Sequence, residues 1–272
     1  MSVADEKPNE EQPEAKQKSG GGVWDTFKIV IQALILALLI RTFLFQPFSI
    51  PSGSMQDTLL VGDFLFVSKY SYGYSRYSVP FSPDIFGGGR LFSSNPERGD
   101  VAVFKWPRDN ATDYIKRVIG LPGDRIQMID GVLHINGEAV ELELIDGDPD
   151  AESRSRTLRY IETLPNGVSH EIVDTFENSA LDNTNEFLVP EGHFFMMGDN
   201  RDGSSDSRDP TSGVGFVPLE NFVGRAEVIF FSVTPQCQLG GRPTYCEENG
   251  AQAWEFWRWP WTLRGDRIFD GL

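Results

Sequence analysis

Apolar residues along the chain form one long run followed by many short ones. The long run lies within VWDTFKIVIQALILALLIRTFLFQPF, where Ile29–Ile40 carries no charge and contains one polar residue, Gln32. With residues 42–45 it nearly reaches the ~20 residues that a membrane-spanning helix needs. Arg41 lies near one end, where its aliphatic stem can reach toward lipid headgroups. The pattern predicts a single anchor over residues 28–46.

A cleaved signal peptide is the main alternative to an anchor, since its apolar region has a similar length. The preceding segment is long and partly acidic, and no Ala-x-Ala follows, although Ser52-Gly53-Ser54 is a loose small-x-small match. We therefore favour a retained anchor. Lysines in residues 1–27 and at Lys28 keep the N-terminus cytoplasmic under the positive-inside rule. Residues 1–27 are expected to form a disordered tail, because they are polar and end near a glycine run.

The remaining apolar segments are short and predict strands. GDFLFVSKY, GDVAVFKWP, DYIKRVIGL, DRIQMIDGVLHINGEAV, EFLVPEGHFFMMGD and GRAEVIFFSV are rich in β-branched and aromatic residues and are bounded by Gly, Pro or Asp. We expect a mainly β fold after residue 47, with an antiparallel β-sheet catalytic core over about 47–123 and 187–235. A β-rich second lobe is expected to be inserted over about 124–186.

Turn residues refine the picture of the inserted lobe. Asp130-Gly131 and Asn136-Gly137 predict two-residue hairpin turns. Residues 138–186 are polar and are expected to be an irregular insertion outside the core. The segment YSRYSVPFSPDIFGGGRLFSSNPERGD is expected to be a long loop or ribbon between two strands.

The net charge and the cysteine content argue against two classes of function, nucleic-acid binding and zinc binding. The net charge of −16 argues against nucleic-acid binding, which needs clustered Lys and Arg. Cys237 and Cys246 lack the spacing of a four-ligand zinc site, so no metal is expected. In an oxidising compartment the two could form a disulfide, and two buried thiols are the alternative.

The candidate bases favour lysine over histidine. His134, His170 and His193 stand in a hairpin, an irregular segment and a turn, where structural or surface roles are expected. Lysine is the other base that a serine nucleophile can use. Lys116 lies in an apolar strand, and although an edge lysine is the usual interpretation, burial there could lower its pKa from roughly 10.4 toward neutrality. Ser54 follows a glycine that lets nearby hydroxyls and backbone amides converge.

The segment MMGDNRDGSSDSRDPTSGVGFVP resembles a calcium loop only in composition. Counting back from Gly203 places Gly198 where an EF-hand needs its first aspartate. A solvated loop is the simple interpretation. Its Ser204, Ser205, Asp206 and Arg208 could instead hold a lysine and lock the loop with an ion pair.

Four segments, in order along the chain, resemble those of bacterial type I signal peptidases. PFSIPSGSMQDTLLVGDFLFVSKYSYG resembles the box around that family's serine nucleophile, and RGDVAVFKWP resembles the next strand. YIKRVIGLPGDRI resembles the box that holds the lysine base, and GDNRDGSSDSR resembles the last catalytic loop. The similarity spans about residues 41–235 and follows an N-terminal anchor, as in that family.

The resemblance implies a Ser/Lys dyad in which Ser54 is the nucleophile and Lys116 the general base. It implies supporting roles for Ser52 and the Ser54 amide as oxyanion hole, for Ser204 in orienting the lysine, and for Asp206 and Arg208 as an ion pair. The residues implied to line shallow pockets for small side chains at the −1 and −3 positions are Ile50, Pro51, Met55, Leu59, Tyr114 and Ile115.

This sequence departs from the family pattern at two places. Asp57 stands where the family often has proline, and the last loop continues as DPTSGVGFVP instead of an aromatic-glycine stretch. Neither change touches Ser54 or Lys116. They put the loop details and the shape of the outer pocket in question.

The implied activity is that of a membrane-anchored serine endopeptidase that removes signal peptides from exported preproteins after small-x-small sites. Its partners would be preprotein signal peptides and membrane lipid, with no cofactor, and we expect a monomer. It would be a single-pass protein of the bacterial inner membrane, with a cytoplasmic N-terminus and a periplasmic (extracytoplasmic) catalytic domain. A catalytically silent envelope protein that binds peptides by strand addition is one alternative. A relative specialised for a pilin or a transfer-system component is another.

The C-terminal segment, residues 236–272, lies beyond this resemblance. It contains AWEFWRWPWTLRGDRIFDGL, with tryptophans at positions 254, 257, 259 and 261. Tryptophan is commonly packed in a core, but near an anchored domain it can also form an interfacial belt. Both interpretations remain open from the sequence.

Overall fold

The computed structural model describes residues 22–79, 89–147, 155–176, 179–236 and 250–272. Most of the predicted N-terminal tail lies outside these residues. Cys237 and Cys246 lie outside them as well, so the disulfide expectation stays a prediction.

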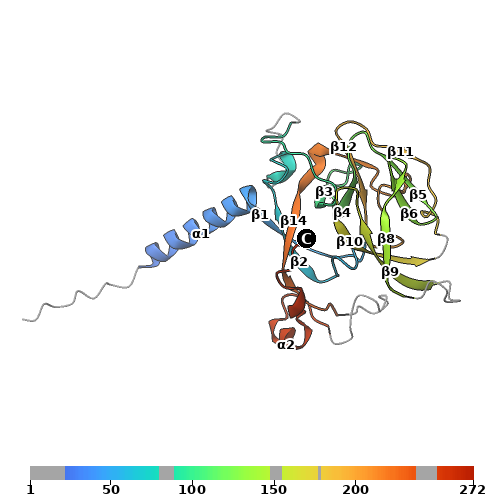
Figure 1. The fold of residues 1–272 in the computed structure, drawn as a ribbon. Helices are drawn as coiled ribbons and strands as arrows, with labels where there is room; N and C mark the ends of the chain where they lie inside the picture. The colour runs from blue at the N-terminus through green and yellow to red at the C-terminus, as the bar shows by residue number, and fades with distance from the viewer. Residues whose placement is uncertain (1–21, 80–88, 148–154, 177–178, 237–249) are drawn as a thin grey trace, which may run out of the picture. The chain divides into compact units, whose positions relative to one another are not determined.

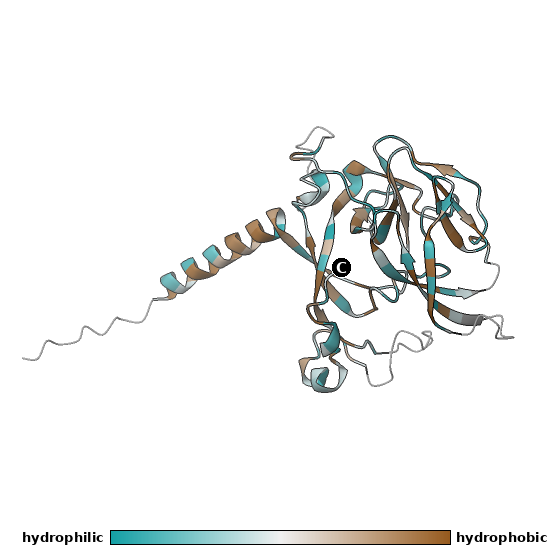
Figure 2. Ribbon diagram, viewed as in Figure 1, coloured by the Kyte–Doolittle hydropathy of each residue, from teal (hydrophilic) through white to brown (hydrophobic). Residues whose placement is uncertain are grey.

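The N-terminal helix α1 (Val23–Phe43) is predominantly apolar, with hydrophilic positions mainly in its first turns, and is long enough to cross a membrane (Figure 2). It begins before the predicted boundary at residue 28, because Val23, Trp24 and Phe27 extend the apolar run. Asp25 lies in the first turn, where its negative charge interacts favourably with the positive end of the helix dipole. The helix ends before residue 46, where the chain begins to pair as a strand.

The β unit, Leu39–Leu272, is built on one antiparallel sheet of seven strands (Figure 1). Its strands are β1 (Phe45–Ser49), β2 (Asp63–Ser68), β3 (Val101–Lys105), β4 (Asp113–Gly120), β12 (His193–Met197), β13 (Phe216–Pro218) and β14 (Phe222–Ser232). Their order across the sheet is β1-β2-β14-β3-β4-β12-β13, so β14, the last in sequence, pairs with β2 on one side and β3 on the other. The prediction of a mainly β, antiparallel core is confirmed.

Two smaller sheets lie between β4 and β12 in the sequence. One has the order β11-β5-β6-β7, and the other has the order β10-β9-β8. Their strands are β5 (Arg125–Ile129), β6 (Val132–Ile135), β7 (Glu138–Ala139), β8 (Glu141–Asp146), β9 (Ser155–Thr163), β10 (Ser169–Phe176) and β11 (Phe187–Leu188). We refer to β5–β10 as the inserted lobe.

The hairpin turns predicted within this lobe are confirmed. Asp130 and Asn136 have φ of 48° and 56°, and Gly131 and Gly137 have φ of 78° and 85°, as type I′ turns require. The expectation of irregular structure over 138–186 is wrong in part, because β8, β9 and β10 lie there. These strands lack a regular alternation, because Leu144 and Ile145 of β8 are exposed and the polar residues Glu162 and His170 are buried.

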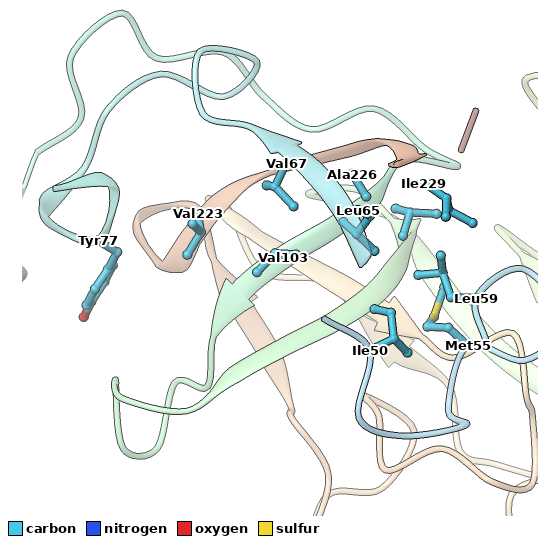
Figure 3. Close-up of a cluster of buried hydrophobic side chains, with 11 residues drawn as sticks. Ile50, Met55, Leu59, Leu65, Val67, Tyr77, Val103, Val223, Ala226 and Ile229 are labelled. Carbon is cyan, nitrogen blue, oxygen red and sulfur yellow. The ribbon is translucent and has the colours of Figure 1, made fainter. Parts of the chain in front are cut away.

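The core beside the β1–β2 connection explains why that segment folds as a tight turn. Ile50, Met55 and Leu59 are buried and lie together, next to Leu65 of β2 (Figure 3). A second buried cluster joins Ile119 of β4 and neighbours in β12 to the apolar face of β5 and β6. The inserted lobe is therefore continuous with the core through packed side chains.

Residues 250–272 pack against the sheet, a question that the sequence had left open. They contain short helical turns at Phe256–Arg258, Trp259–Thr262 and Gly265–Arg267; two further turns, Arg76–Ser78 and Leu219–Asn221, lie elsewhere in the chain. The fully buried Asp63 of β2 accepts hydrogen bonds from Arg264 and Arg267. Gly271 bridges to Val228 of β14. These contacts fasten the segment to the central strands.

Candidate active site

Ser54 lies in the turn between β1 and β2, on a stretch that is fixed from two sides. Met55 and Leu59 are fully buried behind it, and the Leu59 amide donates to the Met55 carbonyl at 2.7 Å. In front, Asn200 donates from its backbone amide to the Ser54 carbonyl at 3.3 Å and from Nδ2 to the Gly53 carbonyl at 3.0 Å. The Ser54 side chain is left half-buried at the rim of the sheet.

Lys116 of β4 reaches the serine directly. Its Nζ lies 2.6 Å from Ser54 Oγ and donates at 3.0 Å to the Ile115 carbonyl. Only 3% of Lys116 is exposed, and this burial lowers its pKa from 10.5 to about 8, while Asp206 and Asp199 act in the opposite direction. A buried amine with this pKa is neutral in a useful fraction of molecules near neutral pH and can accept a proton.

The three histidines do not compete for this position. His134 contacts the Val132 carbonyl within β6, His193 contacts the Glu191 carbonyl at the start of β12, and His170 is buried beside Glu162. Among the described residues none of the three contacts Ser54. No group of three or more His, Cys, Asp or Glu side chains in the described chain could hold a metal ion.

The loop between β12 and β13, here called the β12–β13 loop, carries the predicted ion pair. Arg208 donates from Nε and Nη2 to Asp206 at 3.0 and 2.9 Å, and both side chains are buried. Ser204 is also buried, but its Oγ has no hydrogen-bond partner among the described residues, so its orienting role stays a prediction. A Cβ on Gly198 would lie 2.2 Å from Ser204 Oγ and 2.4 Å from the Ser54 carbonyl oxygen, which shows how closely loop and turn approach.

A second buried pair, which the sequence analysis missed, lies on the other face of β4. Arg117 donates to both oxygens of Asp199 at 2.9 and 2.7 Å and to the Gly99 carbonyl at 2.8 Å. Thr58 Oγ1 donates to Asp199 at 2.6 Å. Burial alone would raise the pKa of Asp199, but the Arg117 guanidinium holds it below its usual value. Arg117 adjoins the predicted base Lys116, and Asp199 lies in the segment predicted to form the last catalytic loop, which was the available signal.

A cavity of about 310 Å³ opens between the end of β1 and the start of β4. Four of the predicted pocket residues line it, namely Ile50, Pro51, Tyr114 and Ile115. Met55 and Leu59 do not, because both are fully buried in the core cluster behind the turn. The complete lining consists of Gln46, Pro47, Phe48, Ser49, Ile50, Pro51, Val103, Asp113, Tyr114 and Ile115. The exposed Ser52 follows Pro51 directly.

This geometry can support acyl transfer. Ser54 supplies a hydroxyl and Lys116 supplies a buried amine at 2.6 Å. The cavity is lined by Pro51, three residues before Ser54, and by Ile115, the neighbour of Lys116 in β4. No histidine or metal is needed for the proton transfer that such a reaction requires.

Comparisons with known proteins agree with this chemistry. The family model described as "Signal peptidase, peptidase S26" matches residues 23–231. The chain is 46% identical over 216 residues to a signal peptidase I of Rickettsia massiliae (strain Mtu5), covering 77% of this chain and 79% of that one. It is 47% identical over 206 residues to a signal peptidase I of Rickettsia typhi (strain ATCC VR-144 / Wilmington), covering 73% and 76%.

A solved structure of a signal peptidase I from Enterococcus faecalis V583 is 26% identical and covers 48% of this chain and 97% of that chain. Its TM-score of 0.30 is too low for a comparison of the two folds.

Proposed function

Because the chain belongs to the signal peptidase family, peptidase S26, we propose that it is a membrane-anchored Ser/Lys endopeptidase that cleaves signal peptides from exported preproteins. The observation that carries this proposal is the 2.6 Å contact between Ser54 Oγ and the buried Lys116 Nζ. A lysine becomes a base only where its charged form is disfavoured, and burial supplies that condition here.

In this mechanism the neutral Lys116 amine accepts the Ser54 hydroxyl proton as Oγ attacks the scissile carbonyl. The Ser52 hydroxyl and the Ser54 backbone amide would donate to the oxyanion that forms. The protonated Lys116 then gives its proton to the leaving amine, which leaves the signal peptide bound to Ser54 as an ester. Water activated by the same amine hydrolyses this ester and restores the site.

Substrate binding is assigned to the cavity between β1 and β4. Among the described strands β1 pairs with β2 alone and forms an edge of the sheet, so an extended peptide can add alongside it. The lining by Ile50, Ile115 and Tyr114 is apolar, and a pocket of limited size favours small side chains at the −1 and −3 positions. This arrangement supports cleavage after small-x-small sites.

Two features support membrane contact. Helix α1 is 21 residues long and apolar, as an anchor requires. Trp254, Trp257 and Trp261 are 68%, 53% and 82% exposed, whereas Trp259 packs on Phe231 with ring centroids 4.7 Å apart. Exposed tryptophans of this kind favour the headgroup region of a bilayer. The anchor would keep the N-terminus in the cytoplasm and the β unit in the periplasm. We expect the protein to be a monomer.

Cleavage of a preprotein with an Ala-x-Ala site tests the catalytic assignment. The full chain in detergent or lipid would be compared with its Ser54→Ala and Lys116→Ala variants. We expect cleavage at that site by the wild type alone, with both variants folded. Cleavage by the Lys116→Ala variant would refute the assigned base. A wild type that binds the preprotein without cutting it would instead favour a peptide-binding protein.

The lipid contact can be tested separately. In vesicles containing brominated lipids, replacing Trp254, Trp257 and Trp261 with serine should reduce the quenching of tryptophan fluorescence. Replacing the half-buried Trp106 with phenylalanine serves as the control, because it directly follows β3 and packs against Tyr114 of β4. Equal quenching in the triple variant and the wild type would refute a lipid-facing role.

A further inference from the structure

The inserted lobe contributes two buried ionisable side chains to the β12–β13 loop. Glu162 of β9 is fully buried and lies opposite His170 of β10 in the strand register. Arg201 of the loop donates from Nη2 to Glu162 Oε1 at 2.5 Å. His170 Nε2 lies 3.3 Å from the same Glu162 oxygen and 3.8 Å from Oδ1 of Asp199. Both lobe residues thus face charged groups of the loop.

Backbone hydrogen bonds make the same junction. The Arg201 amide donates to the Val173 carbonyl at 2.8 Å, and the Val173 amide donates to the Asp199 carbonyl at 2.9 Å. Asn200 between them therefore bridges to Val173 in parallel. Asn200 is also the residue that holds the carbonyls of Gly53 and Ser54. A continuous chain of contacts runs from β10 through the loop to the nucleophile turn.

The side-chain part of this junction is poorly satisfied. Glu162 Oε2, Arg201 Nε and Nη1, and His170 Nδ1 are buried without a hydrogen-bond partner among the described residues, whereas His170 Nε2 has the ionic contact with Glu162. A buried ion pair with unmet groups contributes little to stability relative to packed apolar side chains, because its desolvation offsets its attraction. The main effect of this ion pair is therefore to hold the loop in place, and its contribution to the stability of the fold is small.

We infer that Glu162 and His170 are positioning residues, which hold Arg201 and Asp199 so that the β12–β13 loop presents Asn200 to the nucleophile turn. This inference rests on the proposed function and adds a role for the inserted lobe in the catalytic step. Neither lobe residue lines the cavity assigned to the substrate. The lobe would therefore influence the rate of bond cleavage and leave the binding of the peptide unchanged.

The test measures kcat and KM separately for the full chain and its variants, with a preprotein as substrate. Glu162→Gln keeps the shape of the side chain and removes its charge. We expect kcat to fall about 10- to 100-fold through misplacement of the nucleophile, with KM changed less than about twofold. The matched control is Glu186→Gln, which makes the same change at an exposed pair with Arg125, also 2.5 Å long, and should leave both constants unchanged.

A second variant separates positioning from stability. Glu162→Leu combined with Arg201→Met replaces the pair with apolar side chains, and we expect it to unfold no more easily than the wild type while its kcat stays low. Wild-type kcat in this double variant would overturn the inference. Unfolding of both variants would also overturn it, because the pair would then be required for the fold itself.

Hydrogen exchange gives a readout that does not depend on cleavage. In Glu162→Gln, the amides of Val173 and Arg201 should exchange at least about 10-fold faster, whereas β12 amides should be unaffected. Unchanged exchange at both amides would overturn the inference even if the wild type proved inactive. If the wild type proved inactive and the Val173 and Arg201 amides still exchanged faster in Glu162→Gln, the proposed function would be refuted. The contact between the inserted lobe and the loop would nevertheless be established.

Discussion

Replacing Lys116 with methionine should stabilise the folded protein at pH 7 while abolishing cleavage. Burial lowers the pKa of Lys116 from 10.5 to about 8. Holding the proton in the folded state therefore costs about 3 kcal/mol more than in the unfolded chain. Methionine removes this cost together with the contacts to Ser54 Oγ and the Ile115 carbonyl, each worth about 1 kcal/mol. We expect a net gain of about 1 kcal/mol in the free energy of unfolding, from the difference of these terms.

The gain should depend on pH in a defined direction. Below pH 8 the wild type carries the proton in both states, so the variant keeps its full advantage. Between pH 8 and 10.5 the folded wild type releases the proton while the unfolded chain retains it, so wild-type stability rises with pH. Above 10.5 the variant should be the less stable protein, because only the lost hydrogen bonds remain.

Urea unfolding of the full chain in detergent, followed by tryptophan fluorescence from pH 6 upward, measures this difference. The control is Lys105→Met on the neighbouring strand, where the lysine is less buried and lies 2.9 Å from Asp113. That variant should show no gain at pH 7. A Lys116→Met protein less stable than the wild type at pH 7, or a difference independent of pH, would refute the reasoning.

Three further outcomes follow from the site. The kcat/KM for preprotein cleavage should fall about tenfold per pH unit below about 8, because Lys116 must be neutral to act, and a flat pH profile would contradict this. Gly198→Ala should reduce cleavage about 100-fold, because its Cβ would lie 2.4 Å from the Ser54 carbonyl oxygen, whereas Gly265→Ala, with open space around it, should be tolerated in the same assay. Arg117→Met should lower the free energy of unfolding by about 3–5 kcal/mol in urea titrations, because its buried carboxylate partner loses its counter-charge.

Much of the fold could be predicted because its signals are local. The apolar run of α1, the strands around Lys116 and the two Asx-Gly turns are each set by neighbouring residues. The strands β8–β10 were missed because they break the alternation of apolar and polar residues: Glu162 and His170 are buried, whereas Leu144 and Ile145 are exposed. The place of β14 in the middle of the sheet depends on pairing between residues far apart in sequence, which no local pattern encodes.

The candidate site was predictable to the extent that motifs carry it. Ser54 and Lys116 lie in contact as the resemblance implies. Met55 and Leu59 were assigned to the pocket, but they are the apolar anchors of the turn and point into the core. Glu162 had no local signal, since its partner becomes a neighbour only after the inserted lobe folds against the β12–β13 loop.

The central place of β14 bears on when activity can arise. Until Phe222–Ser232 is available, β2 and β3 have no strand between them, and the sheet consists of two separate ribbons. Such long-range pairing forms late and slowly, because the intervening chain must close first. In the topology proposed above, Ser54 would reach the far side of the membrane well before the sheet that orients Lys116 is complete. A newly made molecule would therefore remain without proteolytic activity during its own translocation, including toward the small residues that follow its own anchor.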